Sequence, residues 1–224
     1  MIEKNFSIDE AIGFGWKKMT ENLGFFIILI LIVFIISFFF STFASLFEEK
    51  LPSLSLIFNI GSILFSVFMN IVFIRVALNI YDGDRGLIPD ILSLSLPLFF
   101  KFLLANVLYF LIVIAGFILF IVPGFYFMVK YQFVLYLVVD KGMDVIPAFN
   151  MSSEITKGIR WRLFLFDLLT GLILLIGVLI IFVGYLVAFP IVLIASIHVY
   201  RKLYSQTGIS ISTDNPFQAP TTAG

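Results

Sequence analysis

The sequence predicts an all-α membrane protein that crosses the bilayer six times, as three helical hairpins, with both termini on the cytoplasmic side. Three observations predict it. The chain of 224 residues is 61% hydrophobic and only 12% charged, whereas about a quarter of the residues in a soluble domain are charged. Its apolar residues gather in long runs separated by short polar segments. Nearly all Lys and Arg residues fall in alternate polar segments, as in the cytoplasmic loops of membrane proteins.

Six apolar runs are long enough, or nearly so, to cross the membrane. A span needs about 20 apolar residues to cross about 30 Å of hydrocarbon, because backbone groups in lipid must bond within the helix. The predicted spans are residues 23–47, 56–81, 98–121, 124–139, 161–182 and 184–204. The first run is longer than a signal-peptide core of roughly 7–15 residues, so we expect it to remain as a span.

Residues 1–22 are predicted to form an amphipathic helix in the membrane interface. Ser7 and Glu10 have the spacing of a capping box, which favours a helix start. At 100° per residue, one arc is apolar and includes Trp16, a residue suited to the interface; it consists of Ile8, Ala11, Ile12, Gly15, Trp16, Met19 and Leu23. Packing of this arc on a soluble partner is the alternative interpretation.

The third and fourth spans meet at Pro123 and Gly124 without a polar loop, which predicts a tight hairpin with its turn at these residues. The fourth span, at about 16 residues, is short, so we expect it to tilt, to lie where the bilayer thins or to be shielded by neighbouring helices. Residues 205–224, rich in Ser, Thr, Pro and Gly, are predicted to be a disordered cytoplasmic tail.

A second interfacial helix is predicted over residues 144–157. Asp144 is placed to cap its start and Gly158 to end it. Ser152 and Thr156 fall inside its apolar arc, where their hydroxyls are expected to bond a neighbouring backbone.

The basic residues predict the orientation. If the six spans are correct, twelve of the fourteen Lys and Arg residues lie on the side of the termini; Lys50 lies opposite and Lys130 lies within a span. Because basic residues are retained on the cytoplasmic face, both termini are expected to be cytoplasmic in a plasma membrane.

Composition excludes several kinds of site. A net charge of zero gives no indication of a nucleic-acid partner. The absence of cysteine excludes disulfides and thiolate metal sites. With a single histidine and no H-E-x-x-H, G-x-S-x-G or phosphate-loop motif, we expect no catalytic residues, cofactor or metal. The favoured function is a structural or accessory protein of the plasma membrane that contacts the lipid bilayer, an anionic lipid or a partner membrane protein. The alternatives are a small transporter or channel, often a homo-oligomer, and a membrane-embedded enzyme acting on lipid.

Polar residues within the spans are the candidate site, because ionisable groups are costly in a bilayer. Depth allows a cluster of Arg75, Asn106, Asp167 and His198 in the cytoplasmic half of the membrane. It is interpreted either as a relay for protons or substrate, or as a buried ion pair of Arg75 with Asp167 that fixes the helices. Lys130 and Gln132 form a second candidate, either as a contact for an anionic headgroup or substrate, or as a lysine whose stem packs on apolar neighbours.

The stretch PGFYFMVKYQFVLYLVVDKG followed by AFNMSSEITKG resembles the membrane domain associated with some glycerophosphoryl diester phosphodiesterases, which uncharacterised bacterial inner-membrane proteins also carry alone. The motif positions are Pro123, Gly124, Tyr126, Lys130, Asp140, Ser152, Thr156 and Gly158. The resemblance implies a bacterial inner-membrane protein. It implies no hydrolase activity, because these residues include no counterpart of the phosphodiesterase catalytic domain.

Overall fold

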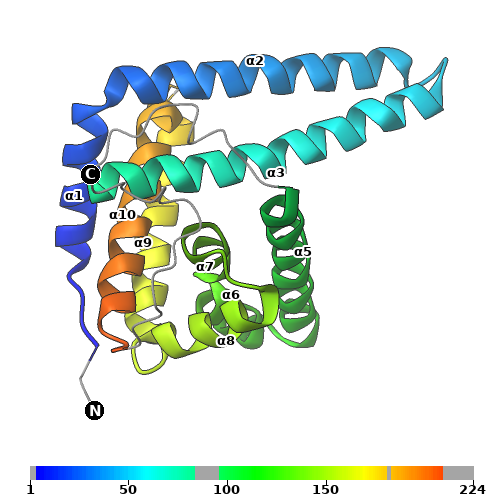
Figure 1. The fold of residues 1–224 in the computed structure, drawn as a ribbon. Coiled ribbons are helices and arrows are strands. Elements are labelled where there is room, and N and C mark those ends of the chain that lie inside the picture. The colour runs from blue at the N-terminus through cyan, green and yellow to red at the C-terminus, as the bar shows by residue number, and fades with distance from the viewer. Residues whose placement is uncertain (1–3, 84–95, 181–182, 209–224) are drawn as a thin grey trace, which may run out of the picture.

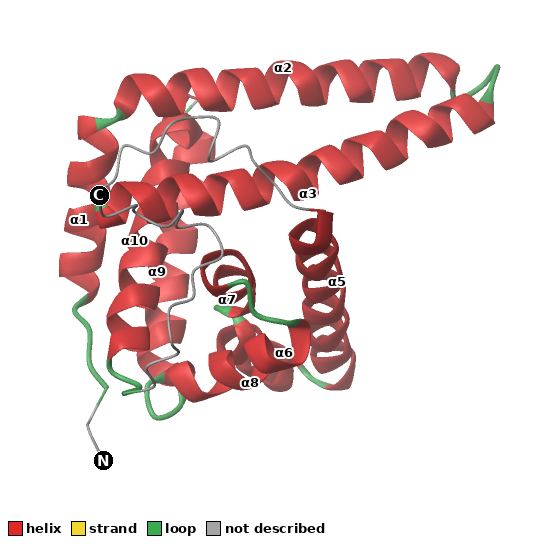
Figure 2. Cartoon of the chain, in the orientation of Figure 1, coloured by secondary structure: helices red, strands yellow, loops and turns green. Residues whose placement is uncertain are grey.

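The computed structural model describes residues 4–83, 96–180 and 183–208, which form helices and no strand (Figures 1 and 2). The predicted all-α class is therefore confirmed. The helices are α1 (Ile8–Glu21), α2 (Leu23–Phe47), α3 (Pro52–Asp82), α5 (Leu96–Leu119), α6 (Ile121–Tyr131), α7 (Val134–Lys141), α8 (Val145–Thr156), α9 (Arg160–Leu179) and α10 (Val183–Ser205).

Six helical segments are long and apolar enough to cross a membrane, as predicted. They are α2, α3, α5, the continuous segment Ile121–Lys141, α9 and α10. Sequence neighbours pack together as the three predicted hairpins, α2 with α3, α5 with α6, and α9 with α10. The predicted tail begins too early, because Ser205 still belongs to α10, and its residues 209–224 lie outside the described residues.

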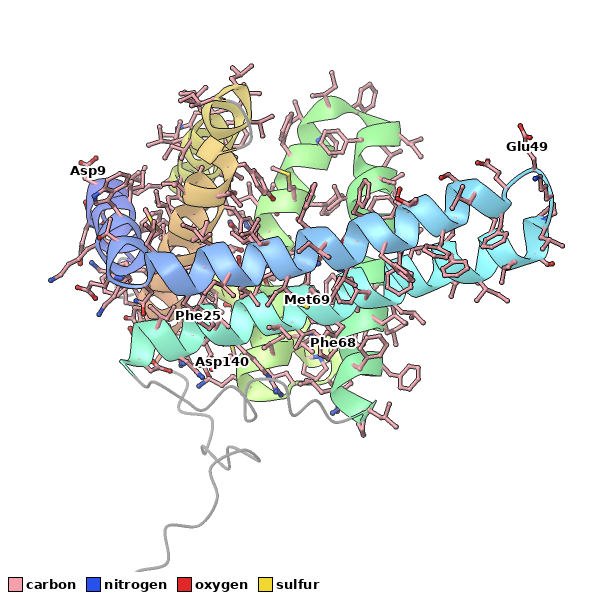
Figure 3. The ribbon with its side chains drawn as sticks, turned by 90° about the horizontal axis from the view of Figure 1, so that it is seen from above. Asp9, Phe25, Glu49, Phe68, Met69 and Asp140 are labelled. Atoms are coloured by element: carbon pink, nitrogen blue, oxygen red, sulfur yellow. The ribbon has the colours of Figure 1, made fainter. Side chains whose placement is uncertain are left out.

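The α2–α3 hairpin lies across the other long helices. It crosses α9 and α10 steeply in both views, and its far end, marked by Glu49, projects beyond the rest of the chain (Figures 1 and 3). The six helices therefore cannot all lie along the bilayer normal, so some of them must be inclined to it. The 31 residues of α3 extend about 46 Å at 1.5 Å per residue, which exceeds the hydrocarbon thickness and favours an inclined span.

The turn between α5 and α6 is not where the sequence places it. The chain turns at Phe120, which has an extended backbone, and Pro123 and Gly124 lie in the first turn of α6. Proline fits there because the first N–H groups of a helix need no intrahelical acceptor. A Cβ on Gly124 would lie 2.4 Å from the Phe117 ring, so glycine is what allows α5 and α6 to approach.

The fourth span is also longer than predicted. It covers the 21 residues Ile121–Lys141, and a turn at Gln132 and Phe133 divides it into α6 and α7. The predicted boundary at residue 124 excluded the first three helical residues because it treated proline as a break. The span needs no thinned bilayer on grounds of length.

Helix α1 packs along α10 and buries Ala11, Gly15 and Met19. Ser7 Oγ accepts a hydrogen bond from the Glu10 backbone N–H at 3.3 Å, as predicted for a cap. Trp16, which belongs to the same predicted apolar arc, is 56% exposed. The position of α1 in the membrane interface stays a prediction.

Helix α8 matches the second amphipathic helix within one residue at each end. Gly158 follows it with φ +83°, a left-handed conformation that favours glycine. Asp144 occupies the N-cap position, but its side chain makes no capping bond. Its carboxylate instead lies 2.7 Å from Lys101 Nζ, because the start of α8 lies beside α5.

Candidate functional site

The four residues of the predicted polar cluster lie on α3, α5, α9 and α10. Arg75 and His198 are buried, and Asn106 and Asp167 are half-buried. The ion pairs among the described residues do not include one between Arg75 and Asp167. The Asp167 carboxyl instead lies within electrostatic range of the phenol groups of Tyr109 and Tyr136. The structure therefore gives His198 and Asp167 separate surroundings.

A network of charges joins the ends of three helices. The Arg201 guanidinium on α10 lies 2.7 Å from an Asp82 carboxylate oxygen on α3 and 3.1 Å from one of Asp140 on α7. Tyr200 donates its hydroxyl proton to the other oxygen of Asp140 at 2.7 Å, and Lys141 Nζ lies 3.5 Å from that carboxylate. We call Asp82, Asp140, Lys141, Tyr200 and Arg201 the ionic network.

Helix ends explain why this network needs a cation. Asp82 and Asp140 both lie in the last turn of their helices, where the negative end of the macrodipole disfavours a carboxylate. Only 8% of the Asp140 side chain is exposed, so water screens its charge poorly. Arg201 forms an ion pair with both acids and thereby joins α3, α7 and α10, and Lys141 supplies the second positive charge.

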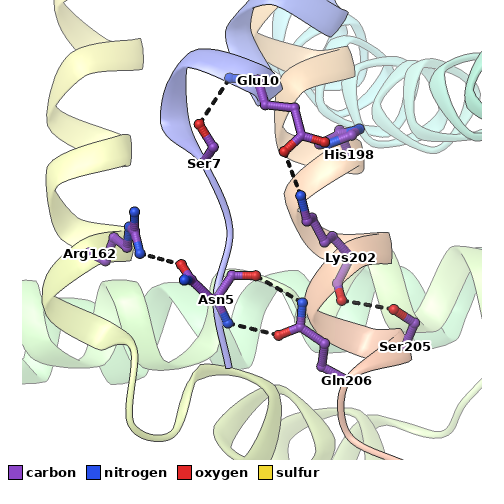
Figure 4. A network of polar contacts seen from close by, with 8 residues as sticks. All are labelled: Asn5, Ser7, Glu10, Arg162, His198, Lys202, Ser205 and Gln206. Carbon is purple, nitrogen blue, oxygen red and sulfur yellow. Dashed lines mark hydrogen bonds and ion pairs between the residues drawn. The ribbon is translucent and has the colours of Figure 1, made fainter. Parts of the chain in front are cut away.

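The N-terminal residues Lys4 and Asn5 form a second polar assembly, which we call the N-terminal clasp; Figure 4 shows the contacts of Asn5. The Asn5 backbone N–H donates to Gln206 Oε1, and Gln206 Nε2 donates to the Asn5 carbonyl, both at 2.8 Å. Arg162 donates to Asn5 Oδ1. Lys4 Nζ donates to backbone carbonyls in the last turn of α8. The negative end of the helix macrodipole lies there and favours a cation. The clasp thus joins the start of the chain to α8, α9 and the end of α10.

Glu10 links α1 to α10 just above the clasp (Figure 4). One of its oxygens lies 2.5 Å from Lys202 Nζ and the other lies 3.6 Å from His198 Nε2. The His198 ring packs against both Phe14 and Tyr81, with centroid distances of 4.8 and 5.8 Å. The hydrogen bond from Lys202, with a smaller contribution from the charge of His198, holds the pKa of the Glu10 carboxyl below its ordinary value of about 4.5.

Replacing Glu10 by glutamine is expected to flatten the loss of stability at acid pH. The carboxyl pKa is lower in the folded than in the unfolded chain, so its contribution to folding is complete above about pH 4.5 and is lost as the pH falls through the folded-state value. Chemical unfolding of wild type and Glu10→Gln between pH 7 and pH 3 measures this. The exposed neighbour Asp9 provides a control for the loss of a carboxylate from the same turn, and the acid dependence should flatten more in Glu10→Gln than in Asp9→Asn. Equal acid dependence in wild type and Glu10→Gln would contradict the proposed link.

Four of the residues that carry the family resemblance, Tyr126, Lys130, Ser152 and Thr156, lie where α6 packs against α8 and α9. The carbonyl of Lys130, in the last turn of α6, accepts hydrogen bonds from Ser152 Oγ at 3.0 Å and Thr156 Oγ1 at 3.2 Å. Arg160 donates to the Tyr126 hydroxyl at 2.7 Å and lies over its ring. The last carbonyls of a helix lack intrahelical partners, so the two hydroxyls satisfy a group at the division of the fourth span. Asp140 belongs to the ionic network instead.

Lys130 and Gln132 have partners within the chain. The Lys130 ammonium lies 4.8 Å from the centroid of the Tyr131 ring, a cation–π distance. Gln132 Nε2 donates to the Val129 carbonyl, in the last turn of α6, at 3.2 Å. Packing of the lysine stem on apolar neighbours and the headgroup contact both stay predictions.

Replacing Thr156 by valine is expected to destabilise the protein by about 1–2 kcal/mol, because a buried carbonyl loses a hydrogen bond while the shape is kept. The side chain is fully buried and its hydroxyl reaches across to α6. Thermal unfolding in detergent measures the effect. Thr20→Val is the matched control, since Thr20 is exposed and bonds only the Lys17 carbonyl of its own helix. A loss of stability in Thr20→Val as large as in Thr156→Val would argue against the interhelical bond.

Sequence reasoning missed the clasp and the partners of Asp140. Asn5 and Gln206 are 201 residues apart, and neither has a motif that marks it. Among the described residues, no three His, Asp or Glu side chains gather into a group able to hold a metal ion. Comparison with protein-family models, with curated proteins and with solved structures finds no match for this chain.

Proposed function

We propose that this integral membrane protein is a structural or accessory protein of the bacterial plasma membrane, without a catalytic centre, that acts by contact with lipid or with a partner protein. The observation that carries the proposal is where its charges lie. Glu10, Asp82 and Asp140 form ion pairs with three cations of the same chain, namely Lys202, Arg201 and Lys141. Charges that bind one another across helices serve the fold and are not free for a substrate.

The contact surface of this function is the α2–α3 hairpin. Its helices bury few side chains over their distal halves, and apolar residues such as Ile35, Phe38 and Ile57 are exposed there. A large exposed apolar surface is typical of lipid-facing or partner-facing regions. The resemblance of the sequence to bacterial inner-membrane proteins is consistent with this function.

We further propose that both termini are cytoplasmic, on the basis of the basic residues in alternate segments. The chain lacks cysteine, so single-cysteine variants label cleanly. Ser53→Cys, near the hairpin tip, should react from outside intact cells, and Ser205→Cys should react only after the membrane is opened. Labelling of both from the same side would contradict the orientation.

A small transporter or channel is the second candidate, favoured by two observations. The fourth span is divided at Gln132 and Phe133, and divided spans line binding sites in many transporters. Asp167 lies on a membrane-spanning helix without an ion pair to a described residue. Intramembrane carboxyl groups mark ion or proton pathways in other proteins.

The contact function is tested with a photoreactive amino acid placed at Phe38, which is 63% exposed on α2. Illumination of whole membranes should give adducts with lipid or with a membrane protein. Position Phe26, buried at 1% exposure on the same helix, is the matched control and should give adducts only within the chain. Adducts of Phe38 confined to this chain would contradict the proposal.

A further inference from the structure

The α2–α3 hairpin carries polar side chains along one side. The phenylalanine rings of α2 and α3 that touch define a contact line along each helix. At 100° per residue, Ser37 and Ser41 of α2 lie roughly 90° around the helix from this line. On α3, a row of serine and asparagine residues lies roughly 90° around the helix from its own contact line. We call these six residues the polar face: Ser37, Ser41, Asn59, Ser62, Ser66 and Asn70.

The two rows lie on the same side of the hairpin. Ring contacts of Phe40 with Phe65 and of Phe47 with Phe58 set the antiparallel register. In this register Ser41 lies level with Leu64, which is two residues, or about 3 Å along the helix, from both Ser62 and Ser66. Since both helices are right-handed and run in opposite directions, rows displaced in the same sense from the contact line face the same way.

The polar face lies where polar groups are costly. Asn59, Ser66 and Asn70 are exposed. Ser66 and Asn70 lie about 21 and 27 Å along a helix of about 46 Å at 1.5 Å per residue, which is near its middle. Hydrocarbon offers no hydrogen bonds, so such side chains in membrane helices face protein or water.

The two asparagines have unused hydrogen-bonding capacity. Asn59 Nδ2 donates to the Ser55 carbonyl at 3.0 Å, and Asn70 Nδ2 donates to the Ser66 carbonyl at 2.8 Å. Within the part of the chain that the structure describes, neither side-chain oxygen accepts a hydrogen bond. Each amide therefore keeps a strong acceptor that can bond whatever covers the hairpin. Asn70 also keeps a second N–H, whereas Asn59 Nδ2 donates a second, longer hydrogen bond to Ser55 Oγ at 3.4 Å.

We propose that the polar face is the interface between two copies of this chain, which pair through their α2–α3 hairpins within the membrane. A carboxamide both donates and accepts, so a face that displays asparagine is complementary to itself about a two-fold axis. The serines are small enough for helix backbones to approach closely. The hairpin projects from its own body (Figures 1 and 3), so a second hairpin can lie against it.

This proposal rests on the proposed function, in which the hairpin lies in the membrane and acts by contact. The first test uses disulfide formation in isolated membranes, since no native cysteine interferes. Ser66→Cys on the polar face should form a covalent dimer at least fivefold faster than Leu64→Cys. Leu64 is at nearly the same depth, is 43% exposed and faces away from the polar face. Equal rates, or no dimer from either Ser66→Cys or Ser41→Cys, would overturn the pairing.

A second measurement separates pairing from the other occupants of the face. The double variant Asn59→Leu/Asn70→Leu should lower the association constant in lipid nanodiscs by about tenfold, since an interhelical hydrogen bond contributes about threefold. An unchanged dimer fraction would overturn the proposal. So would rapid reaction of Ser66→Cys with a membrane-impermeant maleimide, which would show that water or lipid headgroups cover the face. Alkaline extraction of the same membranes tests the proposed function separately, because a chain released by it would not be integral at all.

Discussion

Replacing Gly15 by alanine is expected to lower the free energy of unfolding by about 1–3 kcal/mol, the usual cost of overpacking. A Cβ at this position would lie 2.5 Å from the Ile191 carbonyl oxygen and 3.2 Å from the Ala195 side chain. Neither a backbone carbonyl nor a helix backbone can move aside cheaply, so α1 must separate from α10. The loss should exceed the intrinsic gain of about 1 kcal/mol for replacing glycine by alanine in a helix.

Gly13, in the same helix, is the matched control for this prediction. A Cβ there would meet nothing within 4 Å, so Gly13→Ala should raise stability by up to about 1 kcal/mol. Unfolding in detergent and the rate of tryptic cleavage after Lys17 and Lys18 measure both variants. Undocking of α1 should speed cleavage in Gly15→Ala alone. Stability changes of the same sign in the two variants would refute close packing of α1 on α10.

Replacing Arg201 by methionine is expected to cost about 3 kcal/mol or more, because two carboxylates at helix C-termini lose their shared cation. Asp140 is 8% exposed and would remain as a poorly solvated charge. Replacing Asp82 and Asp140 by asparagine in the same protein should recover most of the loss, because the destabilising charges are then gone. Full additivity of these substitutions would show that the three side chains act independently.

The exposed pair of Lys101 and Asp144 gives the control. These side chains are 37% and 70% exposed, so Lys101→Met should cost less than about 1 kcal/mol. The comparison uses unfolding midpoints in one detergent. A cost for Lys101→Met equal to that for Arg201→Met would mean that burial does not set the value of these ion pairs.

Hydropathy and local motifs predicted the elements because both depend on neighbouring residues. The six apolar segments, the start of α1 at Ser7 and the glycine after α8 are features of this kind. Proline misled the sequence interpretation at Pro123, since the same residue breaks a helix in its middle and fits its first turn. The hydroxyls of Ser152 and Thr156 were correctly expected to bond a neighbouring backbone, although the acceptor, Lys130, could not be named.

The packing of the helices against one another could not be predicted from the sequence. Length and hydropathy indicate that a helix can span a membrane and carry no information about its direction, so the crosswise α2–α3 hairpin was not predicted. The depth of Arg75 and Asp167 allowed a pair, but depth does not fix which helices are neighbours. The sequence marked Asp140 only as a motif position and gave no sign of its partners, because Tyr200 and Arg201 lie on a helix that is distant in the sequence.

The central claim is that the polar groups of the membrane helices stabilise the fold. The reactivity of Asp167 in native membranes tests this claim most directly. A water-soluble carbodiimide modifies carboxyl groups that water reaches, and mass spectrometry reports the modified fraction of each. Asp167 is half-buried on α9 near Tyr109 and Tyr136, whereas exposed Asp9 provides the reference. The account predicts ready modification of Asp9 and protection of Asp167. Rapid modification of Asp167 that solutes can block would contradict it, and would establish a water-filled path of the kind a transporter needs.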